Sequence, residues 1–244
     1  MIEFSLHMAD RIIAVRTNHE EAKRYCAAYL CGGTPDFTVC ISPADIAFER
    51  EKAQREDAIE GKSERNLTDG QLEIAAVQRK IAERLFDFDT ILLHGSVVAV
   101  DGQAYLFTAK SGTGKSTHTR LWRELFGDRA VMVNDDKPFL RITDAGVLAY
   151  GSPWNGKHGL GTNTCVPLKA ICILERGDQN RIQQISAKDA LFMLLQQTNR
   201  PMDRRLMPKY MDLIDRLAPK VSFYRLACHM EPAAAQAAYE AIRR

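Results

Sequence analysis

The segment AKSGTGKS, residues 109–116, constrains this chain more than any other feature. It matches the P-loop pattern GxxxxGK[ST], except that Ala109 stands at the first glycine. A β-like segment, 104–108, precedes it, and a segment of helical character, 117–126, comes after it. Strand, glycine-rich loop and helix in this order are the context in which such loops bind phosphate. The segment therefore predicts binding of a nucleoside triphosphate; the alternative is a glycine-rich turn that only caps an ordinary helix.

Each residue type in this segment has a physical reason to be there. Gly112 and Gly114 let backbone N–H groups turn toward phosphate oxygens, and the next helix adds its positive end. Lys115 places a positive charge on the β- and γ-phosphates, and the Ser116 hydroxyl is a natural Mg²⁺ ligand. We therefore expect ATP, or another nucleoside triphosphate, to be bound with Mg²⁺ by Ser111, Gly112, Thr113, Gly114, Lys115, Ser116 and Thr117.

Two adjacent acids come directly after the next predicted strand, 130–133. Asp135 and Asp136 stand where carboxylates that hold the metal of a phosphate-binding loop are expected, so the predicted metal ligands are Ser116, Asp135 and Asp136. The alternative is a turn with two solvated acids. The strand before the loop reads as the second arm of a hairpin turning at Asp101-Gly102, and the acids lie on the very next strand. This spacing favours a β-rich phosphate-binding core.

Composition excludes several classes of protein. A formal net charge of +2 gives no strong field for a nucleic acid or an anionic membrane, so we expect neither as a partner. No signal peptide is evident at the N-terminus, and no apolar run approaches the length of a membrane helix. The six cysteines form no CxxC pair. The expected location is cytoplasmic.

The chain is expected to fold as an α/β protein with some α+β character, in two parts. Residues 1–70 are predicted to form a small α+β unit, with strands at 12–15 and 37–41, a helix at 20–30 and a polar linker at 51–70. Residues 71–244 are predicted to form the P-loop catalytic domain, a mixed β-sheet with flanking helices. Within it, segments 170–174 and 181–185 are expected to pair with each other.

Three short motifs in a row resemble a known family. His94-Gly95 leads into the predicted hairpin, SGTGKST is the second motif, and Val133-Asn-Asp-Asp136 comes next. Together they resemble the catalytic domain of HPr kinase/phosphorylase, within the wider fold shared with phosphoenolpyruvate carboxykinase. The resemblance implies that His94 lies near the phosphates, that one aspartate accepts a proton from a serine hydroxyl, and that both help to hold Mg²⁺. It makes His94, Lys115, Asp135 and Asp136 the expected catalytic residues, although His94 alone is equally compatible with a core histidine.

The chain departs from this family after the acids. In place of an arginine-bearing loop it has a glycine-rich segment, 151–163, whose glycines and Lys157 suit a mobile lid over phosphate or acceptor. The alternative for this segment is a long irregular surface loop. The departure leaves the acceptor open.

Three functions are compatible with these features. The first is an ATP- and Mg²⁺-dependent kinase that phosphorylates a hydroxyl, on a Ser or Thr of a protein or peptide or on a small alcohol. The second is a nucleotide-binding regulatory switch without kinase activity of its own, and the third is a carboxykinase-type enzyme. The predicted partner is thus a phosphoryl acceptor, a homo-oligomer is compatible with the sequence, and the donor remains open among ATP, ADP and pyrophosphate.

Overall fold

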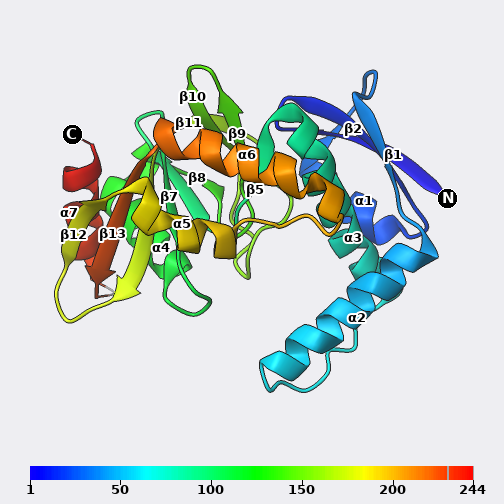
Figure 1. The fold of residues 1–244 in the computed structure, drawn as a ribbon, viewed down its shortest axis with the longest axis horizontal. Coiled ribbons are helices and arrows are strands. Elements are labelled where there is room, and N and C mark those ends of the chain that lie inside the picture. Colours follow the sequence, from blue (N-terminus) through cyan, green and yellow to red (C-terminus); the bar gives the residue numbers. More distant parts are fainter. Residues whose placement is uncertain (230, 244) are drawn as a thin grey trace. The chain divides into compact units, whose positions relative to one another are not determined.

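A computed structural model describes residues 1–229 and 231–243, which form two compact units, Met1–Arg84 and Leu85–Arg244 (Figure 1). The boundary lies later than the residue-70 position expected from the sequence. The reason is helix α3 (Asp69–Arg84), which packs against helices α1 (Glu20–Tyr25) and α2 (Pro43–Ile59) and so belongs to the first unit. None of the helices in the described chain has the length and apolar content needed to cross a bilayer.

The first unit contains a four-stranded sheet in the order β3-β1-β2-β4. Strands β2 (Arg11–Thr17) and β4 (Phe37–Cys40) confirm two predicted strands and pair in parallel. Strand β1 (Ile2–Met8) was not predicted; it pairs antiparallel with β2 and, on its other side, with the short β3 (Leu30–Cys31). The helix expected over 20–30 ends already at Tyr25.

Half of the predicted linker is helical, because α2 extends through Ile59. Its start is well specified: Ser42 Oγ accepts a hydrogen bond from the Asp45 amide, and the Asp45 carboxylate accepts one from the Ser42 amide. The helix was missed because its sequence has no apolar stripe.

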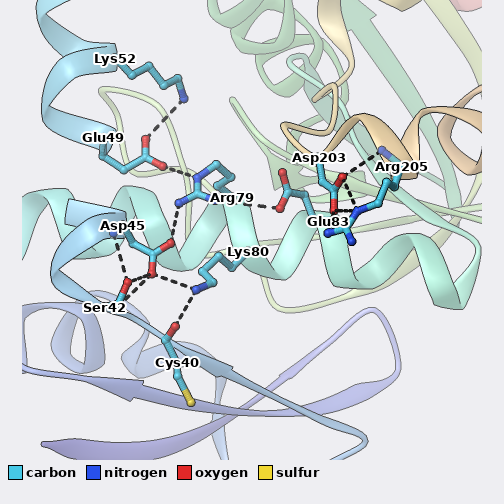
Figure 2. A network of polar contacts seen from close by, with 10 residues as sticks. All are labelled: Cys40, Ser42, Asp45, Glu49, Lys52, Arg79, Lys80, Glu83, Asp203 and Arg205. Carbon is cyan, nitrogen blue, oxygen red and sulfur yellow. Dashed lines mark hydrogen bonds and ion pairs between the residues drawn. The ribbon is translucent and has the colours of Figure 1, made fainter. Parts of the chain in front are cut away.

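Ion pairs, rather than apolar packing alone, attach α2 to α3 (Figure 2). Arg79 donates to Glu49 at 2.6 Å and to Asp45 at 3.0 Å. Lys80 donates to the same Asp45 at 2.9 Å and to the Cys40 carbonyl at 2.8 Å, which ties β4 to both helices. Because Arg79, Asp45 and Glu49 are mostly buried, these contacts are stronger than exposed surface pairs.

The second unit is built on a nine-stranded mixed sheet. Seven strands run in the order β5-β9-β10-β11-β7-β6-β8, and β13 and β12 continue from β11. The strands are β5 (Thr90–Leu92), β6 (Ser96–Val100), β7 (Gln103–Thr108), β8 (Ala130–Asn134), β9 (Phe139–Thr143), β10 (Gly146–Tyr150), β11 (Cys165–Arg176), β12 (Arg181–Ile185) and β13 (Ser222–Cys228). The prediction of a mixed α/β protein with a small N-terminal sheet is confirmed at this level.

Strand β7, which leads into the glycine-rich loop, lies between an antiparallel and a parallel neighbour. It pairs antiparallel with β6 through the predicted Asp101-Gly102 turn, where both residues have positive φ. It pairs in parallel with β11 on its other side, while β8 pairs with the far edge of β6. The predicted pairing of 170–174 with 181–185 is wrong: β13 lies between them, parallel to β11 and antiparallel to β12.

Helices cover both faces of this sheet. Alternate residues of the central strands, such as Val98 and Phe107, pack against α4 (Lys115–Phe126) and α7 (Pro232–Ile242). The residues between them, such as Val97 and Leu106, pack with α5 (Ala187–Gln197) and α6 (Met207–Leu217). This period of two is what a strand buried on both faces requires.

Candidate functional site

The glycine-rich loop, residues 109–116, connects β7 to α4 as predicted from the sequence. Gly112 and Gly114 have φ of 77° and 116°, a region that side chains rarely adopt, so glycine is required for this path. The first helical hydrogen bond runs from the His118 amide to the Gly114 carbonyl at 2.9 Å. The amides of Lys115, Ser116 and Thr117 precede it and are therefore not used within the helix.

Lys115 is mostly buried, and its Nζ donates to the Ala109 carbonyl at 3.2 Å, across the loop. Burial lowers the pKa of Lys115, and the negative charge of Asp136 acts in the opposite direction. The electrostatic interaction with Asp136 links the loop to the acidic pair after β8.

His94 and Asp136 form a direct pair. His94 Nε2 lies 3.1 Å from Asp136 Oδ1. The backbone fixes both ends, because the Gly95 amide donates to the Asp136 carbonyl at 2.9 Å and Thr108 Oγ1 donates to the His94 carbonyl at 2.9 Å. Burial raises the pKa of Asp136, but the hydrogen bond from His94 and nearby positive charges outweigh it and leave this pKa below its usual value. His94 thus sits at the site, and is not a histidine sealed in the core.

Asp135 has a different environment from its neighbour. Its side chain is buried, Oδ1 accepts from the Gly156 amide at 2.6 Å, and Oδ2 is buried without a hydrogen-bond partner. Burial is the main reason that the pKa of Asp135 is raised. Gly156 leaves little spare room, since a Cβ there would lie 3.3 Å from Asp135 Oδ2.

Asn134, which was not among the predicted site residues, holds the acids in place. Its Oδ1 accepts from the Asp136 and Lys137 amides at 2.8 and 2.6 Å. Its Nδ2 donates to the Ser152 carbonyl and hydroxyl and to Asn155 Oδ1, all within 3.1 Å. An asparagine directly before two acids at a strand end is a turn-forming signal that was available in the sequence.

The segment 151–163 is only partly what the sequence suggested. Gly151, Ser152, Pro153 and Trp154 are buried, and Trp154 packs edge-on against Phe139 with ring centroids 6.3 Å apart. Ser152 Oγ donates to the Lys137 carbonyl at 2.6 Å, and the Thr162 amide donates to the Val133 carbonyl. The first half of the predicted lid is therefore an anchored wall of the site, whereas residues 157–159 and 161–163 are exposed.

The residues present fit a Mg²⁺ ion. Ser116, Asp135 and Asp136 would offer only oxygen ligands, and the unpartnered Oδ2 of Asp135 has free lone pairs. Within residues 1–229 and 231–243, no three His, Cys, Asp or Glu side chains gather into a group that could hold a metal ion. Such an ion would therefore depend on the phosphates of a nucleotide for further ligands, as Mg²⁺ commonly does.

The chain is a mixed α/β protein with a glycine-rich loop and an acidic pair in its second unit. Its fold has a distant likeness to solved structures. The HPr(Ser) kinase/phosphatase from Coxiella burnetii matches with a TM-score of 0.37 and 12% sequence identity, over 62% of this chain and 95% of that chain. This structural similarity is distant, and no residue role is taken from it.

The chain belongs to the family described as SynChlorMet cassette protein ScmC, whose model matches residues 62–233. This range covers more than half of the chain and contains the glycine-rich loop, His94 and the acidic pair. A comparison with curated proteins found no match.

Proposed function

We propose that this chain is an ATP- and Mg²⁺-dependent kinase that transfers a phosphoryl group to a hydroxyl, on a Ser or Thr of a protein or peptide or on a small alcohol. The observation that carries the proposal is the convergence of Lys115, the His94–Asp136 pair and the buried Asp135 beside a glycine-rich loop. Phosphoryl transfer requires positioning, charge neutralisation and a proton acceptor, and these residue types supply all three.

Each group has a distinct task in this proposal. The free amides at the start of α4 and the Lys115 ammonium hold the β- and γ-phosphates, and Ser116 with the aspartates holds Mg²⁺, which neutralises charge on the phosphates. The acceptor oxygen bonds to the γ-phosphorus as the bond to the β–γ bridging oxygen breaks. The proton of the acceptor passes to a carboxylate, and Asp135 suits this task because its raised pKa makes it the stronger base.

Asp136 is better suited to remain ionised. The hydrogen bond from His94 holds its carboxylate in one orientation, and its pKa lies below the usual value despite burial. A carboxylate fixed in this way can serve as a metal ligand without competing for the proton.

The test is transfer of label from γ-³²P-ATP with Mg²⁺ to a cell extract or peptide library. Asp135→Asn and Asp136→Asn should each lower transfer by a factor of about 10² or more, while ATP binding stays measurable. Asp128→Asn, at an exposed acid after α4, is the matched control and should behave as wild type. If no acceptor is labelled, and Lys115→Ala behaves like wild type, the proposal fails.

The regulatory switch is the second candidate, and the same loop supports it. It differs in needing no proton acceptor. A switch would transfer no label, and its nucleotide and partner binding would survive Asp135→Asn. Retained partner recognition without any transfer by wild-type protein would therefore favour the switch over the kinase.

A further inference from the structure

A pocket of about 340 Å³ lies against the glycine-rich loop and has no place in the chemistry above. Its walls come from the loop and the first turns of α4, the end of β11 and the end of β13. Thr113, Gly114 and Thr117 line it, whereas His94, Lys115, Asp135 and Asp136 do not. The volume falls in the range of roughly 300–1,000 Å³ that small-molecule sites occupy.

The position of the pocket matches one end of a nucleotide. If the γ-phosphate lies at Lys115 and the aspartates, the α-phosphate end of the polyphosphate chain lies at the opposite side of the loop. The loop residues that line the pocket but not the acidic site, Thr113 and Thr117, mark where that end emerges. In a nucleotide, the ribose and the base are attached to the α-phosphate at this end of the polyphosphate chain.

The walls have the mixed character that a nucleoside needs. Leu121 and Leu174 are apolar and Cys228 is half-buried, which suits the face of a base. Arg176 and His229 are exposed polar residues that suit the α-phosphate and ribose hydroxyls. Arg176 also donates to the Gly112 carbonyl at 2.9 Å, so one wall of the pocket is joined to the loop itself.

The far wall is held together before any ligand binds. The His229 ring is hydrogen-bonded to the Asp178 carbonyl, and the His229 amide donates to Asn180 Oδ1 at 3.1 Å. These contacts fix the turn between β11 and β12 against the end of β13. A preformed wall reduces the ordering cost of binding.

One buried donor beside the pocket has no acceptor. The indole N–H of Trp122, which can only donate, lies 3.1 Å from His118 Nε2, so a neutral His118 ring carries its proton on Nδ1. That Nδ1 is buried without a hydrogen-bond partner, and His118 is one of the residues that line the pocket. Burial lowers the pKa of His118 to about 4, so the ring is neutral near pH 7.

We propose that this pocket binds the ribose and base of the phosphoryl donor, so that the donor is a nucleoside triphosphate and not an inorganic polyphosphate. This inference rests on the proposed function of the loop. It makes Leu121, Leu174 and Cys228 the contacts of the base, and Arg176 and His229 those of the ribose end.

The experiment compares Mg·ATP with Mg·tripolyphosphate by titration calorimetry. Wild-type protein should bind ATP at least about 10-fold more tightly, because only ATP fills the pocket. Cys228→Trp, which fills the pocket, should weaken ATP to the level of tripolyphosphate and change tripolyphosphate affinity by less than about 2-fold. Leu125→Trp, at an exposed position of the same helix α4, is the matched control and should preserve both affinities.

A measurement on wild-type protein removes the dependence on a folded variant. Alkylation of Cys228 by N-ethylmaleimide, detected by peptide mass spectrometry, should be slowed by ATP and not by tripolyphosphate. Equal affinities for the two ligands, or protection of Cys228 by neither or by both, would overturn the inference while leaving the phosphate site intact. Absence of binding by both ligands would instead overturn the proposed function, and this inference with it.

Discussion

At the scale of single residues, Asn134 is predicted to stabilise the segment that carries the two acids. Asn134 is fully buried, and both the oxygen and the nitrogen of its side-chain amide form hydrogen bonds. Asn134→Ala therefore leaves the Asp136 and Lys137 amides and Asn155 Oδ1 without these partners. We expect a loss of about 2–4 kcal/mol in the free energy of unfolding, measured by urea denaturation. Asn66→Ala, at an exposed asparagine, should change it by less than about 0.5 kcal/mol. Equal effects of the two variants would contradict the role of Asn134.

His118 gives a pH-dependent prediction. Its folded-state pKa of about 4 lies below the ordinary 6.5, so the unfolded chain binds this proton more readily between those values. Its contribution to stability is thus intact above pH 6.5 and falls by about 3 kcal/mol as the pH drops toward 4. Unfolding free energies of wild type and His118→Gln should converge over this window. Parallel curves would show that the ring is not held neutral by burial.

Whether a site residue could be predicted from the sequence depended on whether residues next to it along the chain position it. Lys115 and Ser116 lie in the loop and in the helix that begins there, so the motif alone is enough to predict their positions. The hydrogen bonds of Asn134 and Gly156 depend on the segment 151–163 returning to the end of β8, which no local pattern encodes.

At the scale of elements, the contact between α2 and α3 is expected to be acid-sensitive. Burial would raise the pKa of Asp45, but hydrogen bonds from Ser42, Lys80 and Arg79 outweigh it and hold this pKa far below its usual range. A depressed carboxyl pKa stabilises the fold above about pH 4, and this contribution is lost as the pH falls below that value. Asp45→Asn should therefore lower the free energy of unfolding at pH 7. It should also make this free energy fall less steeply between pH 4 and pH 2.5, as measured by helical circular dichroism during urea titrations from pH 2.5 to 7. The same decrease in wild type and variant as the pH falls would contradict the role of the contacts of Asp45.

Element prediction succeeded where local signals act and failed where they do not. The Asp101-Gly102 hairpin was predictable because its turn chemistry lies within two adjacent residues. Helix α2 was not predicted because it lacks the apolar stripe by which a helix is recognised. Ion pairs with Arg79 and Lys80 attach it to α3 instead. The partner of β12 was misjudged because β13, which separates it from β11, lies far along the chain.

At the scale of the whole molecule, the candidate residues all lie in the second unit, Leu85–Arg244, while the family match begins within the first. The mixed sheet brings together the loop after β7 and the acids after β8 because β6 pairs with both strands. That topology was predictable in outline, since the hairpin and the next strand are consecutive. The boundary between the units was not predictable, because α3 packs against β4, α1 and α2, which precede it in the chain.

The most direct measurement of the central claim is calorimetric titration of the intact protein with ATP in the presence of Mg²⁺. Lys115 and the amides at the start of α4 should give saturable binding at one site, and binding should raise the midpoint of thermal unfolding. Lys115→Ala should abolish both effects, whereas Lys188→Ala, at an exposed lysine in α5, should preserve them. Folded wild-type protein that takes up no nucleotide, with Mg²⁺ present, would contradict the claim.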